Sequence, residues 1–207
     1  MQKILENDKN AVSLAVDFLK KGKVISFKTD TVYGLAVDAQ NEKAVESLYK
    51  IKNRQENKSI AIFLPNIKIA QEIFVFDDLA QKIAKDFDSL PLTMILKKKK
   101  GFVNLAKNLN KNDDFLGFRI VKTKFISDLL KNFGGIIAVS SANISGKNAA
   151  IEAFEVEKEF LSIENLLVVD GGICKEKIAS TVIKIDENKI EILREGAIKK
   201  AFFEKYC

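Results

Sequence analysis

Short apolar runs alternate with amphipathic helical segments along this chain, and that alternation restricts its fold more than any other feature. The strand-like runs cover residues 23–27, 32–37, 59–64, 92–96, 116–121, 136–139 and 166–169. Apolar residues at helical spacing occur over 8–21, 41–51, 124–132 and 152–160, and in pieces over 68–87. Asn41 is the expected cap of the second helix, and a closing helix is expected from about residue 197.

The last two strand-like runs decide the type of sheet. Runs 181–185 and 190–193 are joined by a short polar turn, which predicts a hairpin and hence an antiparallel pair. The alternation of strands and helices before them is typical of parallel neighbours. We therefore expect an α/β fold of the α+β type, in which one domain holds a mixed twisted sheet flanked by helices.

Residue usage excludes several classes of function. The 207 residues contain no histidine, which excludes Ser-His-Asp and Cys-His nucleophile pairs and His-ligated zinc. Two cysteines, Cys174 and Cys207, are too few for an all-cysteine zinc site and indicate a reducing compartment. The first residues lack a signal-peptide pattern, and the longest uncharged run, 132–146, is shorter than the roughly 20 apolar residues of a membrane helix. We expect a cytoplasmic protein with no membrane contact and no metal site of its own.

The formal net charge of +6 favours an anionic partner such as a nucleotide or RNA. Of the 34 cationic Lys and Arg side chains only three are arginines, namely Arg54, Arg119 and Arg194. A planar guanidinium can bind a carboxylate or phosphate through two parallel hydrogen bonds, which lysine cannot do. Composition alone leaves structural ion pairs as an equal alternative.

Polar segments interrupt the apolar pattern at several strand and helix ends, where ligands collect in open sheets. Lys52, Arg54 and Lys58 follow the second predicted helix. They either offset the dipole at its C-terminus or neutralise a polyphosphate. The phosphate-binding patterns G-x-x-x-x-G-K-[ST] and G-x-G-x-x-G are both absent.

Three further segments carry hydroxyl, amide or cationic side chains: 28–35, 140–146, and Ser180–Val182 with Arg194 after the hairpin. Each of them, taken alone, has an ordinary explanation. The first can be a hydrogen-bonded turn, the second a polar loop, and the arginine a surface charge on an edge strand.

Taken in order, these segments resemble the YrdC family, the threonylcarbamoyl-AMP synthases of tRNA modification. The matching pieces are K-T-D-T-V-Y-G-L-A at 28–36, K-N-R at 52–54, P-L-T-M-I-L at 91–96, L-G-F-R at 116–119, S-S-A-N-I-S-G at 140–146, S-T-V at 180–182 and R-E-G-A at 194–197. The resemblance spans nearly the whole chain, and all three arginines fall inside its motifs. It implies a single YrdC-like domain over residues 1–207, the short form without a further C-terminal domain.

The resemblance also implies a function and a set of site residues. The family joins L-threonine, bicarbonate and ATP into threonylcarbamoyl-AMP and releases pyrophosphate, with Mg²⁺ arriving on the nucleotide. The implied ATP contacts are Lys52, Arg54, Lys58, Ser141, Asn143 and Arg194, of which Lys52, Arg54 and Arg194 would act in catalysis. The implied threonine contacts are Thr31, Arg119 and Ser180. The product would pass to a separate tRNA threonylcarbamoyl transferase, and a contact with tRNA or other RNA is an additional expectation.

Departures from the family pattern leave alternatives open. Many relatives carry a histidine in the strand after K-x-R, where this chain reads S-I-A-I-F and ends at Phe63, so one threonine contact is left open. YciO-like relatives lack both K-x-R and S-x-N, and this chain has both.

The main alternative is a non-catalytic RNA-binding module, supported by the charge and by the lysine run 97–100, which a solvated hairpin tip also explains. Carbamoyl transfer in metal-cofactor maturation is a second alternative, although its proteins are larger and carry cysteine-rich segments.

Overall fold

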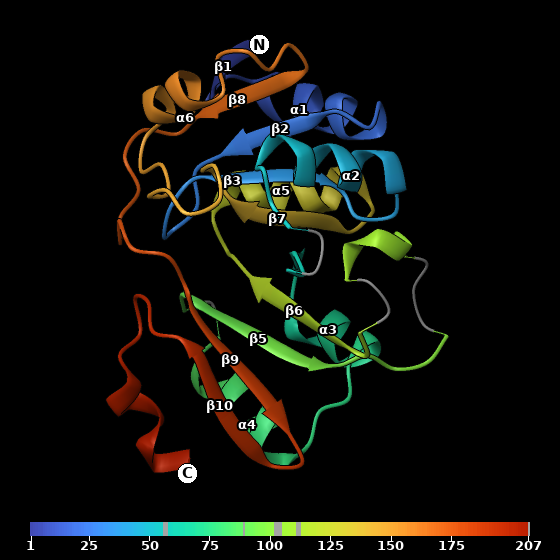
Figure 1. The fold of residues 1–207 in the computed structure, drawn as a ribbon, viewed down its shortest axis with the longest axis vertical. Coiled ribbons are helices and arrows are strands. Elements are labelled where there is room, and N and C mark those ends of the chain that lie inside the picture. The colour runs from blue at the N-terminus through green and yellow to red at the C-terminus, as the bar shows by residue number, and fades with distance from the viewer. Residues whose placement is uncertain (56–57, 89, 102–104, 111–112, 207) are drawn as a thin grey trace.

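The computed structural model describes residues 1–55, 58–88, 90–101, 105–110 and 113–206, and in these residues a ten-stranded sheet is formed (Figure 1). Its strands are β1 Gln2–Leu5, β2 Val24–Phe27, β3 Gly34–Asp38, β4 Ala61–Leu64, β5 Leu92–Lys97, β6 Phe115–Ile120, β7 Ile137–Ser141, β8 Leu166–Asp170, β9 Thr181–Asp186 and β10 Lys189–Arg194. They lie in the order β1-β8-β2-β3-β7-β4-β6-β5-β9-β10.

The sheet is mixed, as expected. The pairs β1–β8, β2–β8, β4–β6 and β5–β9 are parallel, and the other neighbours are antiparallel. Figure 1 shows β8, β2, β3 and β7 running across the upper part of the molecule, with β6, β5, β9 and β10 running obliquely below them. This change of direction along the sheet is the accumulated strand twist.

The helices cover the sheet on both faces. They are α1 Ala11–Lys20, α2 Glu42–Ile51, α3 Ile67–Ile73, α4 Asp78–Asp86, α5 Lys124–Phe133 and α6 Ala153–Glu159, with 3₁₀ helices at Lys107–Leu109 and Lys200–Tyr206. Helices α1 and α5 pack on one face of β2, β3, β7 and β8, and α2 and α6 belong to the core on the other face (Figure 1). The α/β fold with a mixed, helix-flanked sheet is therefore confirmed.

Local chemistry sets the ends of several elements. The side chain of Asn41 caps α2 by accepting a hydrogen bond from the backbone N–H of Ala44 at 3.1 Å. Gly134 ends α5 in the left-handed conformation, at φ 69°. Glu187 and Asn188 take positive φ angles of 50° and 57° and form the turn between β9 and β10.

The structure differs from the sequence expectations at several places. Strand β1 was not predicted, because only Ile4 of its four residues is even partly buried and the segment has no apolar alternation. Its pairing with β8 creates it. The closing helix is a 3₁₀ helix that begins at Lys200, and β3 begins at Gly34 rather than at residue 32.

Two further expectations concern the two cysteines and membrane-spanning helices. Cys174 is a buried free thiol, and Cys207 lies outside the described residues. Burial raises the pKa of the Cys174 thiol to about 11. Of the helices that the structure describes, none has the length and apolar character required to cross a membrane.

Candidate active site

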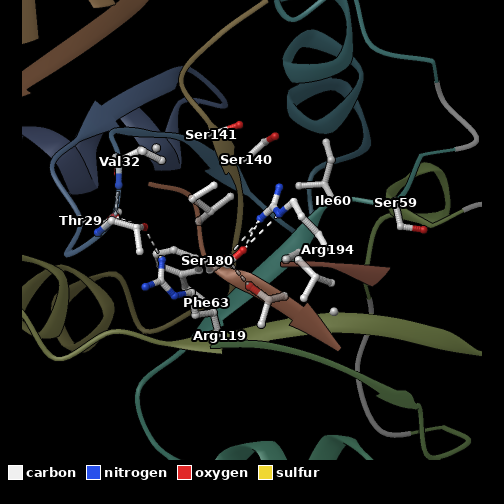
Figure 2. A pocket seen from close by; sticks show the side chains of 18 of the residues that line it. Thr29, Val32, Ser59, Ile60, Phe63, Arg119, Ser140, Ser141, Ser180 and Arg194 are labelled. Atoms are coloured by element: carbon white, nitrogen blue, oxygen red, sulfur yellow. Dashed lines mark hydrogen bonds between the residues drawn. The ribbon is translucent and has the colours of Figure 1, made fainter. Parts of the chain in front are cut away.

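A cavity of about 400 Å³ lies where the β2–β3 loop and the end of β7 face strands β4, β6, β5, β9 and β10 (Figure 2). Strand register aligns part of its lining. Phe63 of β4 is opposite Arg119 of β6, and Thr93 of β5 is opposite Val182 of β9, which is in turn opposite Arg194 of β10. Side chains opposite each other project from the same face of a sheet, so pairing brings these distant residues to one cavity wall.

A β-bulge determines the position of Arg194. The register between β9 and β10 shifts between Ile192 and Arg194, so that Leu193 is the extra residue and Arg194 is opposite Val182. Val182 lines the cavity, and Ile192 packs against the hydrophobic core. Without the bulge, Arg194 would project from the same face as Ile192. The bulge therefore places the guanidinium at the cavity.

The β2–β3 loop positions Thr31 through a local turn. The hydroxyl of Thr29 accepts hydrogen bonds from the backbone N–H groups of Thr31, at 3.1 Å, and Val32, at 3.3 Å. This is the hydroxyl-closed turn that such a sequence favours. It leaves the Thr31 hydroxyl in contact with Arg119, whose Nη1 donates to it at 2.8 Å.

Arg119 is the most deeply buried of the three arginines. Its side chain is 4% exposed, and its Nη2 donates to both carboxylate oxygens of Asp30, at 2.7 and 2.6 Å. The Nε atom is buried and has no hydrogen-bond partner among the described residues. Burial lowers the pKa of Arg119, and the Asp30 carboxylate acts in the opposite direction. The guanidinium is therefore charged, and Asp30 balances its charge. Within the described part of the chain its Nε donor has no acceptor.

Arg54 and Arg194 are held by carbonyl groups instead. Arg54 donates from Nε to the carbonyl of Lys58 at 2.9 Å and from Nη2 to that of Ser59 at 2.8 Å. Arg194 donates from Nε and Nη2 to the carbonyl of Ser180, at 3.1 and 2.8 Å (Figure 2). Within the described part of the chain, neither arginine has an acidic partner.

The three guanidinium groups are close enough to affect one another. Desolvation lowers the pKa of Arg194, and the charge of Arg54 lowers it further. After burial, the charge of Arg194 also contributes to the lowered pKa of Arg119. Among the described residues, Arg119 alone of the three arginines is balanced by a carboxylate, so the described lining has an excess of positive charge at Arg54 and Arg194. Such a site favours a polyanion.

Lys52 is buried outside the cavity lining. Its side chain is 1% exposed, and its Nζ donates to the carbonyl of Ser141, to the carbonyl of Asn143 at 2.7 Å and to the Asn143 side-chain oxygen at 3.2 Å. The hydroxyl of Ser141 donates to the same side-chain oxygen at 2.6 Å. Burial lowers the pKa of Lys52 to about 7. Lys52 therefore fastens the segment after β7 to the end of α2.

The structure brings six of the residues predicted from the sequence to one cavity: Thr31, Arg54, Arg119, Ser141, Ser180 and Arg194. Three others, Lys52, Lys58 and Asn143, are not part of its lining. Lys52 and Asn143 bind each other behind Ser141, and Lys58 exposes its side chain while its carbonyl receives Arg54. The roles assigned to all nine residues stay predictions.

Two polar residues that bind predicted site residues were not singled out from the sequence. Asp30 neutralises Arg119, and buried Thr93 shares a 2.8 Å hydrogen bond between its hydroxyl and that of Ser180. Both lie within the motifs at 28–36 and 91–96, but no local pattern identifies their partners, which are 89 and 87 residues away. Phe63, at the position discussed for a histidine, places its ring centroid 6.0 Å from the Arg119 guanidinium carbon.

The chain is similar to proteins of a known family. The family model for Sua5, YciO and YrdC, described as "Telomere recombination", matches residues 17–196. A protein of Methanocaldococcus jannaschii named putative threonylcarbamoyl-AMP synthase is 38% identical over 202 residues, covering 95% of this chain and 92% of its own length. The threonylcarbamoyl-AMP synthase of Bos taurus is 29% identical, and the match covers 90% of this chain and 68% of the relative.

Solved structures share the fold. The crystal structure of P. abyssi Sua5 complexed with L-threonine has a TM-score of 0.89 and 27% identity, covering 99% of this chain but 60% of that chain. The chain thus spans about three fifths of the Sua5 polypeptide. The crystal structure of E. coli YciO, at 19% identity and a TM-score of 0.85, is alike in fold. The family model matches most of this chain, and the three scarce arginines of the chain lie at one cavity. The chain therefore belongs to the Sua5/YciO/YrdC family.

Proposed function

We propose that this protein is a threonylcarbamoyl-AMP synthase, a nucleotidyltransferase that forms threonylcarbamoyl-AMP and pyrophosphate from L-threonine, bicarbonate and ATP for tRNA threonylcarbamoyladenosine modification. The convergence of Arg54, Arg119 and Arg194 on one cavity carries the proposal. Relatives named threonylcarbamoyl-AMP synthase and the L-threonine complex of P. abyssi Sua5 support it.

The amino acid binds at the end of the cavity formed by Thr31, Arg119 and Ser180. Arg119 attracts the threonine carboxylate, and the hydroxyls of Thr31 and Ser180 fix the orientation of the substrate. Thr93 holds the Ser180 hydroxyl through their 2.8 Å hydrogen bond, and Asp30 holds the guanidinium of Arg119. These two residues act as positioning groups.

The nucleotide binds toward Arg54, Ser141 and Arg194, where the positive charge is unbalanced. Arg54 neutralises the departing pyrophosphate, and Arg194 faces the α-phosphate. Lys52 and Asn143 act through Ser141, whose segment they hold in place. This changes the expected role of Lys52 from a direct phosphate contact to support of the nucleotide end.

The reaction has two bond-forming steps. The threonine amine attacks the carbon of bicarbonate, and loss of water gives a carbamate. A carbamate oxygen then forms a bond to the α-phosphorus of ATP while the bond from that phosphorus to the bridging oxygen breaks, and pyrophosphate leaves. Neither step requires an imidazole, because such chemistry depends mainly on positioning and on cations that face the developing charge.

Magnesium is proposed to enter on the ATP phosphates, where it neutralises part of their charge. The lining consists of arginine, hydroxyl and apolar groups, and among the described residues no three His, Cys, Asp or Glu side chains are grouped to hold a metal. Mg²⁺ prefers carboxylate and phosphate oxygens. The donor set therefore fits a metal carried by the nucleotide.

The surroundings of the lysine run do not favour an RNA-binding module. Lys98 donates from Nζ to the side-chain oxygen of Asn110 at 3.3 Å, and Lys99 donates to the carbonyl of Gln71 at 2.7 Å. Both lysines lie in the segment that follows β5, and each binds another segment of the protein itself. Transfer of the product to a tRNA threonylcarbamoyl transferase, any RNA contact and the cytoplasmic location stay predictions.

The decisive experiment measures pyrophosphate release from ATP in the complete mixture, without threonine and without bicarbonate. Mass spectrometry identifies the adenylate. We expect release only when both are present. Arg194→Ala should abolish most of the release, whereas Lys189→Ala, an exposed change on the same strand, should not. Release that is independent of threonine, or no release from a folded protein that binds RNA with a steep salt dependence, would overturn the proposal.

A further inference from the structure

We propose that Gly117 selects the amino-acid substrate by size, because its missing side chain leaves a hollow in the cavity floor that accepts the β-methyl group of threonine. The inference rests on the proposed function and adds to it a residue that determines specificity. It comes from the position of a glycine in the middle of β6, a strand paired with β4 and β5.

Packing within the protein does not require glycine at this position. A Cβ added at Gly117 would lie 3.4 Å from Cβ of Ala61 and 3.5 Å from both Cγ1 of Ile95 and Cγ2 of Thr93, which are ordinary van der Waals distances. At Gly34 a Cβ would come within 2.9 Å of Val139, a position where packing does require glycine. Glycine weakens a strand interior and often marks the close approach of a ligand.

The hollow lies at the amino-acid end of the cavity. Gly117 precedes Arg119 by two residues on one strand, so both face the cavity, and both belong to its lining. Thr93, which borders the hollow, is hydrogen-bonded to Ser180. The buried Nε of Arg119 has no partner in the described part of the chain, an independent sign that a ligand completes this end.

The walls of the hollow decide which group it takes. The atoms nearest to the missing Cβ are carbon atoms of Ala61, Ile95 and Thr93. A surface of this kind gives no hydrogen bond and favours a hydrocarbon group. Threonine carries a methyl group on its β-carbon, and serine does not. The hollow therefore favours threonine over serine through one methyl group.

Gly117→Ala tests this directly, because the new methyl group fills the hollow. One methyl or methylene group in an apolar pocket changes kcat/KM by about 10- to 200-fold. We expect the threonine-to-serine ratio of kcat/KM, measured by pyrophosphate release, to fall about tenfold or more in the variant. The KM for ATP and the midpoint of thermal unfolding should not worsen, since alanine suits a strand better than glycine.

Thr93→Ser provides a second variant that enlarges the same hollow. It removes Cγ2, which lies 3.5 Å from the place that a Cβ at position 117 would take, and keeps the hydroxyl that binds Ser180. Added to Gly117→Ala it should restore part of the preference for threonine. Alone it should raise the activity with 3-hydroxyvaline, which carries one more methyl group, relative to threonine.

The outcomes separate this inference from the proposed function. A wild-type protein that releases no pyrophosphate with threonine contradicts the proposed function. If the wild type is active, an unchanged threonine-to-serine ratio in folded Gly117→Ala contradicts the inference alone, as does an equal loss with both amino acids. If Gly117→Ala does not fold, an unchanged response of Thr93→Ser to 3-hydroxyvaline overturns the inference.

Discussion

Arg119 and Asp30 form a buried ion pair, in which Nη2 of Arg119 donates to both carboxylate oxygens of Asp30 at 2.7 and 2.6 Å. The charge at this end of the cavity is therefore balanced. Arg54 and Arg194, which we assign to the nucleotide end, are held by backbone carbonyls, and Arg194 also contacts the Ser180 hydroxyl at 3.3 Å. The two ends suit different ligands, because a zwitterionic amino acid needs little net charge from the protein and a triphosphate needs a large excess of cations.

Arg119→Lys should raise the KM for threonine far more than the KM for ATP. Lysine cannot keep the contacts that the guanidinium makes with Asp30 and Thr31 while it binds a substrate carboxylate. The loss in kcat/KM for threonine should be roughly a hundredfold, a few kcal/mol of transition-state stabilisation. Steady-state pyrophosphate release with each substrate varied in turn measures it.

Arg54→Lys is the matched control for this change, because it is the same substitution at the other end of the cavity. It should affect the KM for ATP more than the KM for threonine. Equal effects of either variant on both substrates would contradict the assignment of the two ends.

Deletion of Leu193 should leave the KM for ATP near the wild-type value. The deletion removes the extra residue of the bulge and keeps Arg194 opposite Val182, on the cavity face. Arg194→Ala should instead lower kcat/KM for ATP by roughly a hundredfold, because it removes a cation near the reacting phosphate. A deletion variant that folds and is as inactive as Arg194→Ala would show that the register does not govern the position of the arginine.

Lys52 should make the stability of the protein rise with pH. Its pKa is 10.5 in the unfolded chain and about 7 in the folded protein, so between these values the unfolded state binds more protons. The free energy of unfolding should therefore increase through this window, by up to about 1.4 kcal/mol per pH unit. Urea denaturation from pH 7 upward measures the slope.

Lys52→Met should remove this part of the slope, and Lys43→Met, at an exposed position of α2, the helix that ends just before Lys52, should retain it. The test compares the pH slopes of the two variants, so the contributions of other groups cancel in their difference. Identical slopes in Lys52→Met and Lys43→Met would mean that Lys52 stays charged in the folded protein.

Magnesium should bind only together with ATP. Chelation by EDTA should abolish pyrophosphate release, and added Mg²⁺ should restore it. Isothermal titration of Mg²⁺ into the protein without nucleotide should give no saturable signal, because the described residues offer no cluster of metal-binding side chains. Saturable binding in the absence of ATP would point to a metal site on the protein itself.

Much of the fold could be predicted from local patterns. The periods of the apolar residues predicted nine of the strands and the mixed sheet, and Asn41 was recognisable as the cap of α2. The scarcity of arginine drew attention to Arg54, Arg119 and Arg194, and their positions inside the family motifs assigned them to the site. Such features are local, because a strand, a helix cap or a residue type is defined by its immediate neighbours.

Pairing between distant segments decided the rest. Regular alternation along β10 places Arg194 on the same face as Ile192, and only the bulge against β9 brings it to the cavity. The chain order Lys52-Asn53-Arg54 suggests two equivalent phosphate contacts, but the tertiary structure buries Lys52 beneath Ser141 and leaves Arg54 at the cavity. Sequence periodicity tells which face of an element is apolar. Register, bulges and the partners of buried charges depend on strands that meet only when the chain has folded.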